Sequence, residues 1–266
     1  MVRVLTRNDG YSLVELLVTM ALVGLIASSS LGIYQVAQQT YTRAVSLEDA
    51  QSASRAVLDR MASDFRFIGS FWTGASGAGS AITAATSGSI TFYGDTDANT
   101  LDSDGNEDTL ALDASSGSTV ITVSRATGAD GAAAFVPGAY VYLDSGAARE
   151  VRSITAVLGT AITLGTALAK TYPAGSLVRA VETVTYTFNP APANTLTRSL
   201  NGGTAEVLAA NVTGLTLTYF DGSSPPAVTT TLDAIRQIEV TLTVRGPDGS
   251  ARRMTTRVKP PNLALT

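Results

Sequence analysis

The chain of 266 residues has a net charge of −4 and contains neither cysteine nor histidine. Without cysteine there is no disulfide framework and no thiol chemistry. Without histidine the usual neutral-pH general base and the commonest transition-metal ligand are missing. Hydrophobic residues make up 45% and charged residues 15%, so the chain has enough apolar material for a packed core. The composition therefore argues against most hydrolase mechanisms and against a duplex-binding protein.

A long apolar run follows the first ten residues, MVRVLTRNDG. Between Leu16 and Val36 the only ionisable side chain is that of Tyr34. About twenty apolar residues are enough for an α-helix to cross the hydrocarbon layer. The two arginines of the leader place it on the cytoplasmic side of the membrane. The sequence therefore predicts a transmembrane helix directly after a short basic leader.

Two other interpretations of this run stay open. A secretory signal has a shorter apolar core of roughly 7–15 residues and a small-residue cleavage site, which Ala27-Ser28-Ser29 could supply. A plain membrane anchor would be apolar as well. Neither interpretation explains Glu15, because a carboxylate inside a membrane helix is costly unless it has a partner.

A family resemblance lies at the start of the apolar run, in the residues GYSLVELLV from Gly10 to Val18. They resemble the N-terminal signal of type IV prepilins and of type II secretion pseudopilins. The resemblance implies that a membrane aspartyl peptidase cuts between Gly10 and Tyr11 and that Tyr11 is then N-methylated. It also implies that Glu15 pairs with the Tyr11 amine of a neighbouring subunit, and two desolvated opposite charges attract strongly. Tyr11 stands where the family more often has phenylalanine, which keeps an aromatic ring at the new terminus.

The helix is expected to continue beyond the membrane as an amphipathic half whose apolar residues recur at spacings of three and four. Two pairs at the i,i+4 distance, Arg55 with Asp59 and Arg60 with Asp64, are expected on the opposite, polar face. Gly69 is the expected stop. The apolar stripe consists of Leu47, Ala50, Ser54, Val57, Met61, Phe65 and Ile68, with Leu58 beside it.

Strand patterns dominate the remainder of the chain after a Gly/Ser/Ala-rich connector at residues 69–89, which is predicted to be loop. We expect an α+β fold in which the long N-terminal helix packs on an antiparallel β-sheet, with a small β subdomain inserted. The predicted strands are Ile90–Tyr93, Val120–Val123, Ala139–Leu143, Val151–Val157, Ala161–Leu164, Thr183–Phe188, Leu215–Tyr219, Ile238–Val244 and Met254–Val258.

The predicted organisation has five segments. They are a leader at 1–10, an N-terminal helix at 11–68 with its membrane part at 11–36, a connector, strand and acidic loop at 69–113, an inserted β subdomain at 114–180, and a C-terminal antiparallel sheet at 181–266. Residues 181–246 contain the runs VTYTFN, NTLTRSL, EVLAANVTGLTLTYFDG and AIRQIEVTLTVR. With these runs they resemble larger minor pilins of the PilW type and J-type pseudopilins. The length of the chain and the extra β segment favour the pilus over the secretion system.

The acidic run GDTDANTLDSDGNED carries oxygen-bearing side chains in alternation, a pattern that suits Ca²⁺. It departs from the EF-hand pattern, because Thr100 occupies the position of the loop glycine, Gly105 comes early and Asp113 would have to replace the closing glutamate. The alternative is a solvated acidic turn between strands. The candidate calcium ligands are Asp95, Asp97, Asn99, Asp102, Asp104, Asn106 and Asp108.

Neither catalysis nor nucleic-acid binding is expected. No G-x-S-x-G motif surrounds any serine, and no histidine is present to activate one. One basic concentration, formed by Arg252, Arg253, Arg257 and Lys259, is interpreted as an exposed strand face. The aromatic content of 6% offers no obvious platform for stacking bases.

The sequence therefore predicts a structural subunit, a minor pilin of a type IV pilus. It would enter the inner membrane with its leader in the cytoplasm and lose the leader to the prepilin peptidase. It would then join other pilin subunits through its N-terminal helix, with the pilus assembly machinery, in a cell-surface filament. The first alternative is a J-like pseudopilin of a type II secretion system in a periplasmic filament. The second is a membrane-anchored or secreted binding module that does not assemble.

Overall fold

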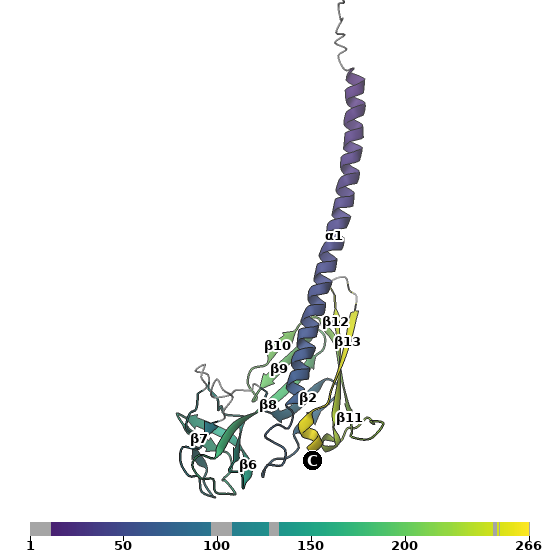
Figure 1. The fold of residues 1–266 in the computed structure, drawn as a ribbon. Helices are drawn as coiled ribbons and strands as arrows, with labels where there is room; N and C mark the ends of the chain where they lie inside the picture. The colour runs from purple at the N-terminus through teal and green to yellow at the C-terminus, as the bar shows by residue number, and fades with distance from the viewer. Residues whose placement is uncertain (1–11, 97–107, 128–132, 247–248, 250, 266) are drawn as a thin grey trace, which may run out of the picture. The chain divides into compact units, whose positions relative to one another are not determined.

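The computed structural model describes residues 12–96, 108–127, 133–246, 249 and 251–265. The chain divides into two compact units, Met1–Asp49 and Ala50–Thr266, which we call the N-terminal unit and the β unit. One α-helix, α1 (Leu13–Arg66), contributes residues to both units (Figure 1).

In the N-terminal unit, α1 is mostly apolar between Leu16 and Val36 and carries more polar side chains from Gln38 onward. Leu13–Val45 is the one stretch in the described part of the chain that is long and apolar enough to cross a membrane. Its most apolar part is not buried against the rest of the protein. Its hydroxyl groups donate to the carbonyl oxygen three or four residues earlier, as in Ser30 Oγ to Ile26 O at 2.8 Å and Thr40 Oγ1 to Val36 O at 2.8 Å. Because these polar groups are satisfied within the helix, they add little cost to its transfer into lipid.

The described residues of the β unit form two antiparallel sheets and two short 3₁₀ helices, η1 (Leu232–Ala234) and η2 (Pro261–Leu265). The smaller sheet has the order β11-β12-β13, formed by β11 (Val212–Phe220), β12 (Gln237–Arg245) and β13 (Ala251–Val258). The larger sheet is built from β1 (Ile82–Ala85), β2 (Ser89–Gly94), β3 (Asp108–Thr109), β4 (Val120–Thr122), β5 (Tyr140–Asp144), β6 (Arg149–Leu158), β7 (Ala161–Leu164), β8 (Leu177–Asn189), β9 (Thr195–Leu200) and β10 (Glu206–Ala209).

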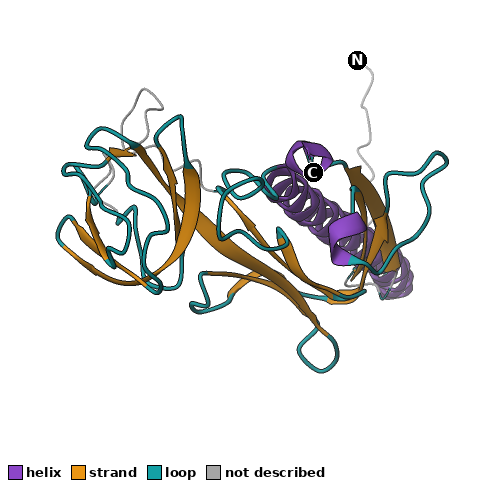
Figure 2. Ribbon diagram, turned by 90° about the horizontal axis from the view of Figure 1, so that it is seen from below, coloured by secondary structure: helices purple, strands orange, loops and turns teal. Residues whose placement is uncertain are grey.

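The 13-residue strand β8 joins the two parts of the larger sheet. Its first half pairs with β3 and β5, and its second half pairs with β2 and β9. In Figure 2 the strands accordingly fall into two groups, one beside α1 and one farther from it. Each group has its own buried hydrophobic cluster, so β8 links two cores.

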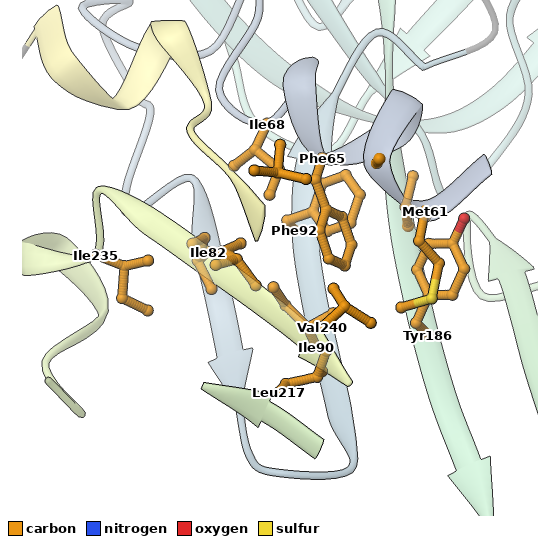
Figure 3. Close-up of a cluster of buried hydrophobic side chains, with 14 of the residues drawn as sticks. Met61, Phe65, Ile68, Ile82, Ile90, Phe92, Tyr186, Leu217, Ile235 and Val240 are labelled. Atoms are coloured by element: carbon orange, nitrogen blue, oxygen red, sulfur yellow. The ribbon is translucent and has the colours of Figure 1, made fainter. Parts of the chain in front are cut away.

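The main core lies between the C-terminal turns of α1 and the two sheets (Figure 3). Met61, Phe65 and Ile68 are fully buried there. The Phe65 ring meets the rings of Phe92 on β2 and Tyr186 on β8 edge-on, each with centroids 5.7 Å apart. Edge-to-face pairs of this kind add about 0.5–1.5 kcal/mol beyond the area that they bury. The amphipathic half of the helix is thus held by a specific aromatic contact as well as by apolar burial.

The structure confirms the predicted α+β class and most of the predicted strands, and it corrects the prediction at several places. The connector at 69–89 is not all loop, because Ile82–Ala85 forms strand β1, which is held by pairing Ile82 with Phe92. Strands β9 and β10 were not predicted, and β8 begins at Leu177 rather than Thr183.

The helix ends at Arg66, close to the predicted stop at Gly69, whose φ is +79°. The side chains of Leu47 and Ala50 lie outside the described residues.

Candidate functional site

The first described turns of the chain carry the candidate assembly residue. Gly10 and Tyr11 lie outside the described residues, whereas Glu15 lies in the first turn of α1 with an exposed side chain. The backbone N–H groups of Glu15 and Leu16 both donate to the carbonyl oxygen of Ser12, at 3.0 and 3.1 Å. A carboxylate at a helix N-terminus interacts favourably with the helix dipole. Glu15 is therefore placed where a cation from another molecule can reach it.

Small residues form one face of the apolar segment, because Gly24, Ser28 and Gly32 follow one another at intervals of four. A Cβ added at Gly24 or Gly32 would meet nothing within 4 Å. The described fold therefore does not itself require glycine at these positions. In membranes, small residues at this spacing let another helix approach closely.

A buried ion network lies between α1 and the larger sheet. Asp64 is 1% exposed and Arg198 of β9 is 6% exposed. The Asp64 Oδ2 atom accepts from Arg198 Nε at 2.8 Å and from the Tyr186 hydroxyl at 2.8 Å. The Oδ1 atom pairs with Arg60 Nε at 3.1 Å. This network corrects the sequence prediction, which assigned Asp64 to the polar face of the helix.

The network continues to the segment that leads into the acidic run. Arg198 Nη2 lies 3.3 Å from Thr96 Oγ1, and the backbone N–H of Thr96 donates to the buried Glu182 carboxylate at 2.9 Å. Four segments, the helix, β8, β9 and the chain after β2, are thereby fixed to one another by charged hydrogen bonds. Buried charges need this degree of pairing to be tolerated.

The candidate calcium ligands are divided between described and undescribed residues. Asp95 Oδ2 pairs with Arg179 Nη1 at 2.8 Å, and Asp108 Oδ2 accepts the backbone N–H of Arg125 at 3.0 Å. The other candidates, Asp97, Asn99, Asp102, Asp104 and Asn106, lie outside the described residues. Within the described ranges no group of three acidic side chains suited to a metal occurs. Calcium binding therefore stays a prediction, and any ion would share Asp95 and Asp108 with protein donors.

A second buried carboxylate, Glu150, lies on β6 and binds several neighbouring groups. Its side chain is fully buried and pairs with Arg152. It also accepts the backbone N–H of Ala169 at 2.7 Å and of Lys170 at 3.2 Å, together with the Tyr172 hydroxyl at 3.2 Å. Because every partner belongs to this protein, we interpret Glu150 as a structural residue that fixes the loop after β7 against β6.

The predicted basic face belongs to β13. Arg252, Arg253 and Arg257 are all exposed there. The Arg257 guanidinium bonds to Glu239 of β12, with Nε at 3.0 Å from Oε2, and lies 4.8 Å from the centroid of the Phe220 ring. Arg257 thus has partners on its own sheet, and the absence of nucleic-acid binding stays a prediction.

Buried and half-buried tyrosines make the stability of the β unit sensitive to alkaline pH. Burial raises the pKa of Tyr93 to about 12 and also raises the pKa values of Tyr172, Tyr186 and Tyr219. Unfolded tyrosine ionises near pH 10. Above about pH 10 the folded state therefore holds protons that the unfolded state has lost.

We expect the melting temperature to change little between about pH 8 and 9.5 and to fall steadily from about pH 10 to 12, because stability decreases wherever the folded state binds more protons. Circular dichroism melts of the full chain in detergent, read with tyrosinate absorbance, check this. A melting temperature that already falls below about pH 9 would contradict the assignment, because the chain has no histidine or cysteine to titrate there.

The family comparison bears on the N-terminal segment. The family model described as the prokaryotic N-terminal methylation motif matches residues 5–31. The match includes Gly10, Tyr11 and Glu15 and supports a structural protein of the type IV pilin or pseudopilin kind. It implies in general terms association with other pilins and with the prepilin peptidase, and together with the apolar helix it fits membrane anchoring. The search of curated proteins and the search of solved structures found no match.

Sequence reasoning predicted the N-terminal motif that the family model matches, and it missed the buried network. A signal for Asp64 exists in the sequence, because position 64 lies seven residues after Val57 and four residues before Ile68. That spacing places it on the apolar face of the helix. No comparable pattern in the sequence identifies its partners Tyr186 and Arg198, which lie on β8 and β9.

Proposed function

We propose that the protein is a minor pilin, a structural subunit that the prepilin peptidase processes and that assembles into a type IV pilus. The observation that carries the proposal is the methylation motif at residues 5–31, which overlaps the start of an exposed apolar helix, Leu13–Val45. A membrane anchor without assembly accounts for the apolar helix but leaves Glu15 and the motif without a role.

The physical argument for assembly is that the apolar surface of α1 exchanges contacts with lipid for contacts with neighbouring helices. Before assembly, the apolar surface of α1 contacts lipid, and its hydroxyl groups donate hydrogen bonds to carbonyl oxygens of the same helix. In a filament, packing against neighbouring helices replaces the lipid contacts. Glu15, paired with the Tyr11 amine of a neighbour, would then set the register between subunits.

The C-terminal part of α1 is firmly attached to the sheets of the β unit. Phe65 and Asp64 of α1 bind the sheet through aromatic packing and buried charges. Such buried ionic contacts are best attested as devices that fix register. The same helix therefore supplies both the apolar segment and part of the core of the β unit.

The test of the proposal is the N-terminus of the mature protein. The full chain is produced in cells that contain a prepilin peptidase, and membranes and sheared filaments are analysed by intact mass and N-terminal sequencing. We expect a chain that lacks residues 1–10 and begins with N-methyl-Tyr11. The Gly10→Leu variant, which blocks the cleavage site, should keep Met1.

Two outcomes of this experiment overturn the proposal. A mature chain that begins near Ser30 indicates a conventional secretory signal, and an uncut wild-type chain indicates a simple anchor. Recovery of the methylated chain with a secretion apparatus, and not in sheared surface filaments, assigns the protein to the pseudopilins instead.

We predict that Gly32→Leu lowers incorporation into filaments by at least about fivefold while processing and membrane insertion stay normal. The added side chain has open space in the single chain, but it would hold a neighbouring helix away. Quantitative immunoblots of sheared and membrane fractions measure the effect. Leu31→Ile, an exposed apolar exchange one position away, is the control, and equal incorporation of both variants would contradict the prediction.

A further inference from the structure

One edge of the smaller sheet is formed by β13, which pairs only with β12 among the strands of the described residues. The pairing runs from Ala251 to Val258 without a register shift. The opposite edge of this sheet, on β11, is already bonded to the rest of the β unit, since the Leu217 N–H donates to Ser87 O at 2.8 Å. We call the outer side of β13 the β13 edge. It lies outside the N-terminal segment and plays no part in the proposed function.

The direction of each backbone group on β13 follows from the alternation of an antiparallel ladder. The Arg245 N–H of β12 donates to Asn211 O, beside β11, at 2.9 Å. Arg245 and every second residue before it on β12 therefore direct their N–H and C=O groups to β11, and the residues between them direct theirs to β13. Val240 is one of the latter and pairs with Thr256. Thr256 thus binds β12, whereas the residues on either side of it direct their backbone groups outward.

The outward backbone groups of β13 include those of Arg253, Thr255 and Arg257. All three residues are exposed, and no described residue makes a hydrogen bond to their N–H or C=O groups. The strand, ARRMTTRV, also lacks the proline and the bulge that commonly block the edge of a sheet. The β13 edge therefore presents main-chain donors and acceptors to a further antiparallel strand.

The hairpin that carries this edge is positively charged. Residues 237–259 contain five cationic and two acidic side chains, a net charge of +3, whereas the whole chain carries −4. One of the acids, Asp248, lies outside the described residues, and the other, Glu239, accepts from Arg257 Nε at 3.0 Å. Arg252 and Arg253 are exposed and make no side-chain hydrogen bond or ion pair with a described residue. Their guanidinium groups are therefore available to carboxylates of another molecule.

The same charges argue against two other occupants. A second copy of β13, antiparallel and centred on Thr255, would place Arg253 opposite Arg257, and like charges directly opposite destabilise a strand pair. A single-stranded nucleic acid needs rings on which its bases can stack. β13 contains no aromatic residue, and the Arg257 guanidinium lies over the Phe220 ring, 4.8 Å from its centroid. Unbonded main-chain groups beside arginines instead match an extended acidic peptide.

We propose that the β13 edge binds an extended acidic segment of another protein as a further antiparallel strand. The segment exchanges main-chain hydrogen bonds with Arg253, Thr255 and Arg257. Residues that face each other in such bonds have their side chains on the same face of the sheet, so every second side chain of the segment lies beside these residues. Carboxylates at those positions bind the arginines. The main-chain contacts supply affinity, and the arginines select for negative charge.

The experiment measures fluorescence anisotropy of labelled ten-residue peptides with the full chain in detergent. The probes alternate threonine with glutamate, with glutamine or with lysine. We expect the glutamate peptide to bind at least about tenfold more tightly than the other two and to weaken as salt rises. Arg252→Ala/Arg253→Ala should lose at least about tenfold in affinity for this peptide. The control Arg66→Ala/Arg149→Ala removes two exposed arginines elsewhere, on α1 and β6, and should change the affinity by less than about twofold.

Methylated peptides test the strand geometry on the unchanged protein. Glutamates that lie opposite Arg253 and Arg257 direct their N–H groups to β13, whereas the alternating threonines direct theirs away from it. N-methylation of the glutamates should therefore abolish binding. N-methylation of the threonines, which adds as many methyl groups, should change the affinity by less than about threefold.

A second variant tests the edge without changing its charge. Thr255→Pro removes an outward N–H and leaves the bonds of the neighbouring residues to β12 in place, and proline on an edge strand blocks further pairing. We expect the variant to fold, as measured by circular dichroism, and to lose binding of the glutamate peptide.

Four results would each overturn the proposal. They are equal binding of the three peptides, equal effects of the two methylations, unchanged binding to a folded Thr255→Pro protein, and preference for oligo-dT or polygalacturonate over the glutamate peptide. Because N-terminal processing is not measured, failure here leaves the proposed pilin function unaffected.

Discussion

Replacing Asp64 by alanine is expected to lower the free energy of unfolding of the β unit by about 3–5 kcal/mol. The change removes the acceptor for both Arg198 and Tyr186. Arg198 is 6% exposed and would stay charged without its carboxylate partner in a site that water scarcely reaches. Leaving such a charge unpaired costs more than the pair itself contributes to stability. Urea unfolding of the full chain in detergent, followed by circular dichroism, measures the difference.

Two further variants separate the charge from the packing. Asp59→Ala changes an exposed carboxylate on the same helix and should alter stability by no more than about 0.5 kcal/mol. The triple variant Asp64→Leu/Arg198→Met/Tyr186→Phe replaces the three buried side chains that meet at Asp64 Oδ2 and should recover most of the lost stability. An Asp64→Ala protein as stable as Asp59→Ala would show that the network is not desolvated as the structure has it.

This network shows where sequence reasoning reaches its limit. The hydrogen bonds of Asp64 join residues 122 and 134 positions apart in the chain. Periodicity can place a residue on a face of its own helix, but it carries no information about which strand will lie opposite. The same reason explains β1 and β10, whose short sequences hold strand geometry only because β2 and β9 pair with them.

The features that the sequence did predict are those fixed by neighbouring residues. The order of glycine, aromatic residue, glutamate and apolar run at Gly10–Val18 is a local signal, and the family match lies on it. Strands β7 and β12 each bury one face, and a strand with one buried face has apolar residues at alternating positions. That pattern is visible in the sequence, so both strands were predicted close to their observed bounds. The acidic run is different, because alternating acidic side chains are compatible both with a metal site and with bonds to other protein groups. In the structure Asp95, near its start, pairs with Arg179, and Asp108, at its end, accepts the backbone N–H of Arg125.

Glu15→Ala is expected to reduce incorporation into filaments by at least about tenfold without affecting cleavage after Gly10. The apolar segment stays long enough to span the membrane, and removing a carboxylate makes insertion into lipid easier. In the filament, however, the Tyr11 amine of the adjoining subunit would be buried without a counter-charge. An unpaired buried charge costs several kcal/mol, and about 1.4 kcal/mol corresponds to a factor of ten in an equilibrium. Immunoblots of sheared filaments against membranes, with intact mass to confirm processing, measure the ratio.

The control for this variant lies on the same helix. Glu48 is also exposed but lies beyond the apolar stretch, which ends at Val45. Its carboxylate stays hydrated in either environment, so Glu48→Ala should assemble within about twofold of the wild-type level. Equal incorporation of Glu15→Ala and Glu48→Ala would mean that Glu15 has no partner in the filament. The pairing of Glu15 with Tyr11 would then have to be abandoned, even if the mature chain begins with a methylated Tyr11.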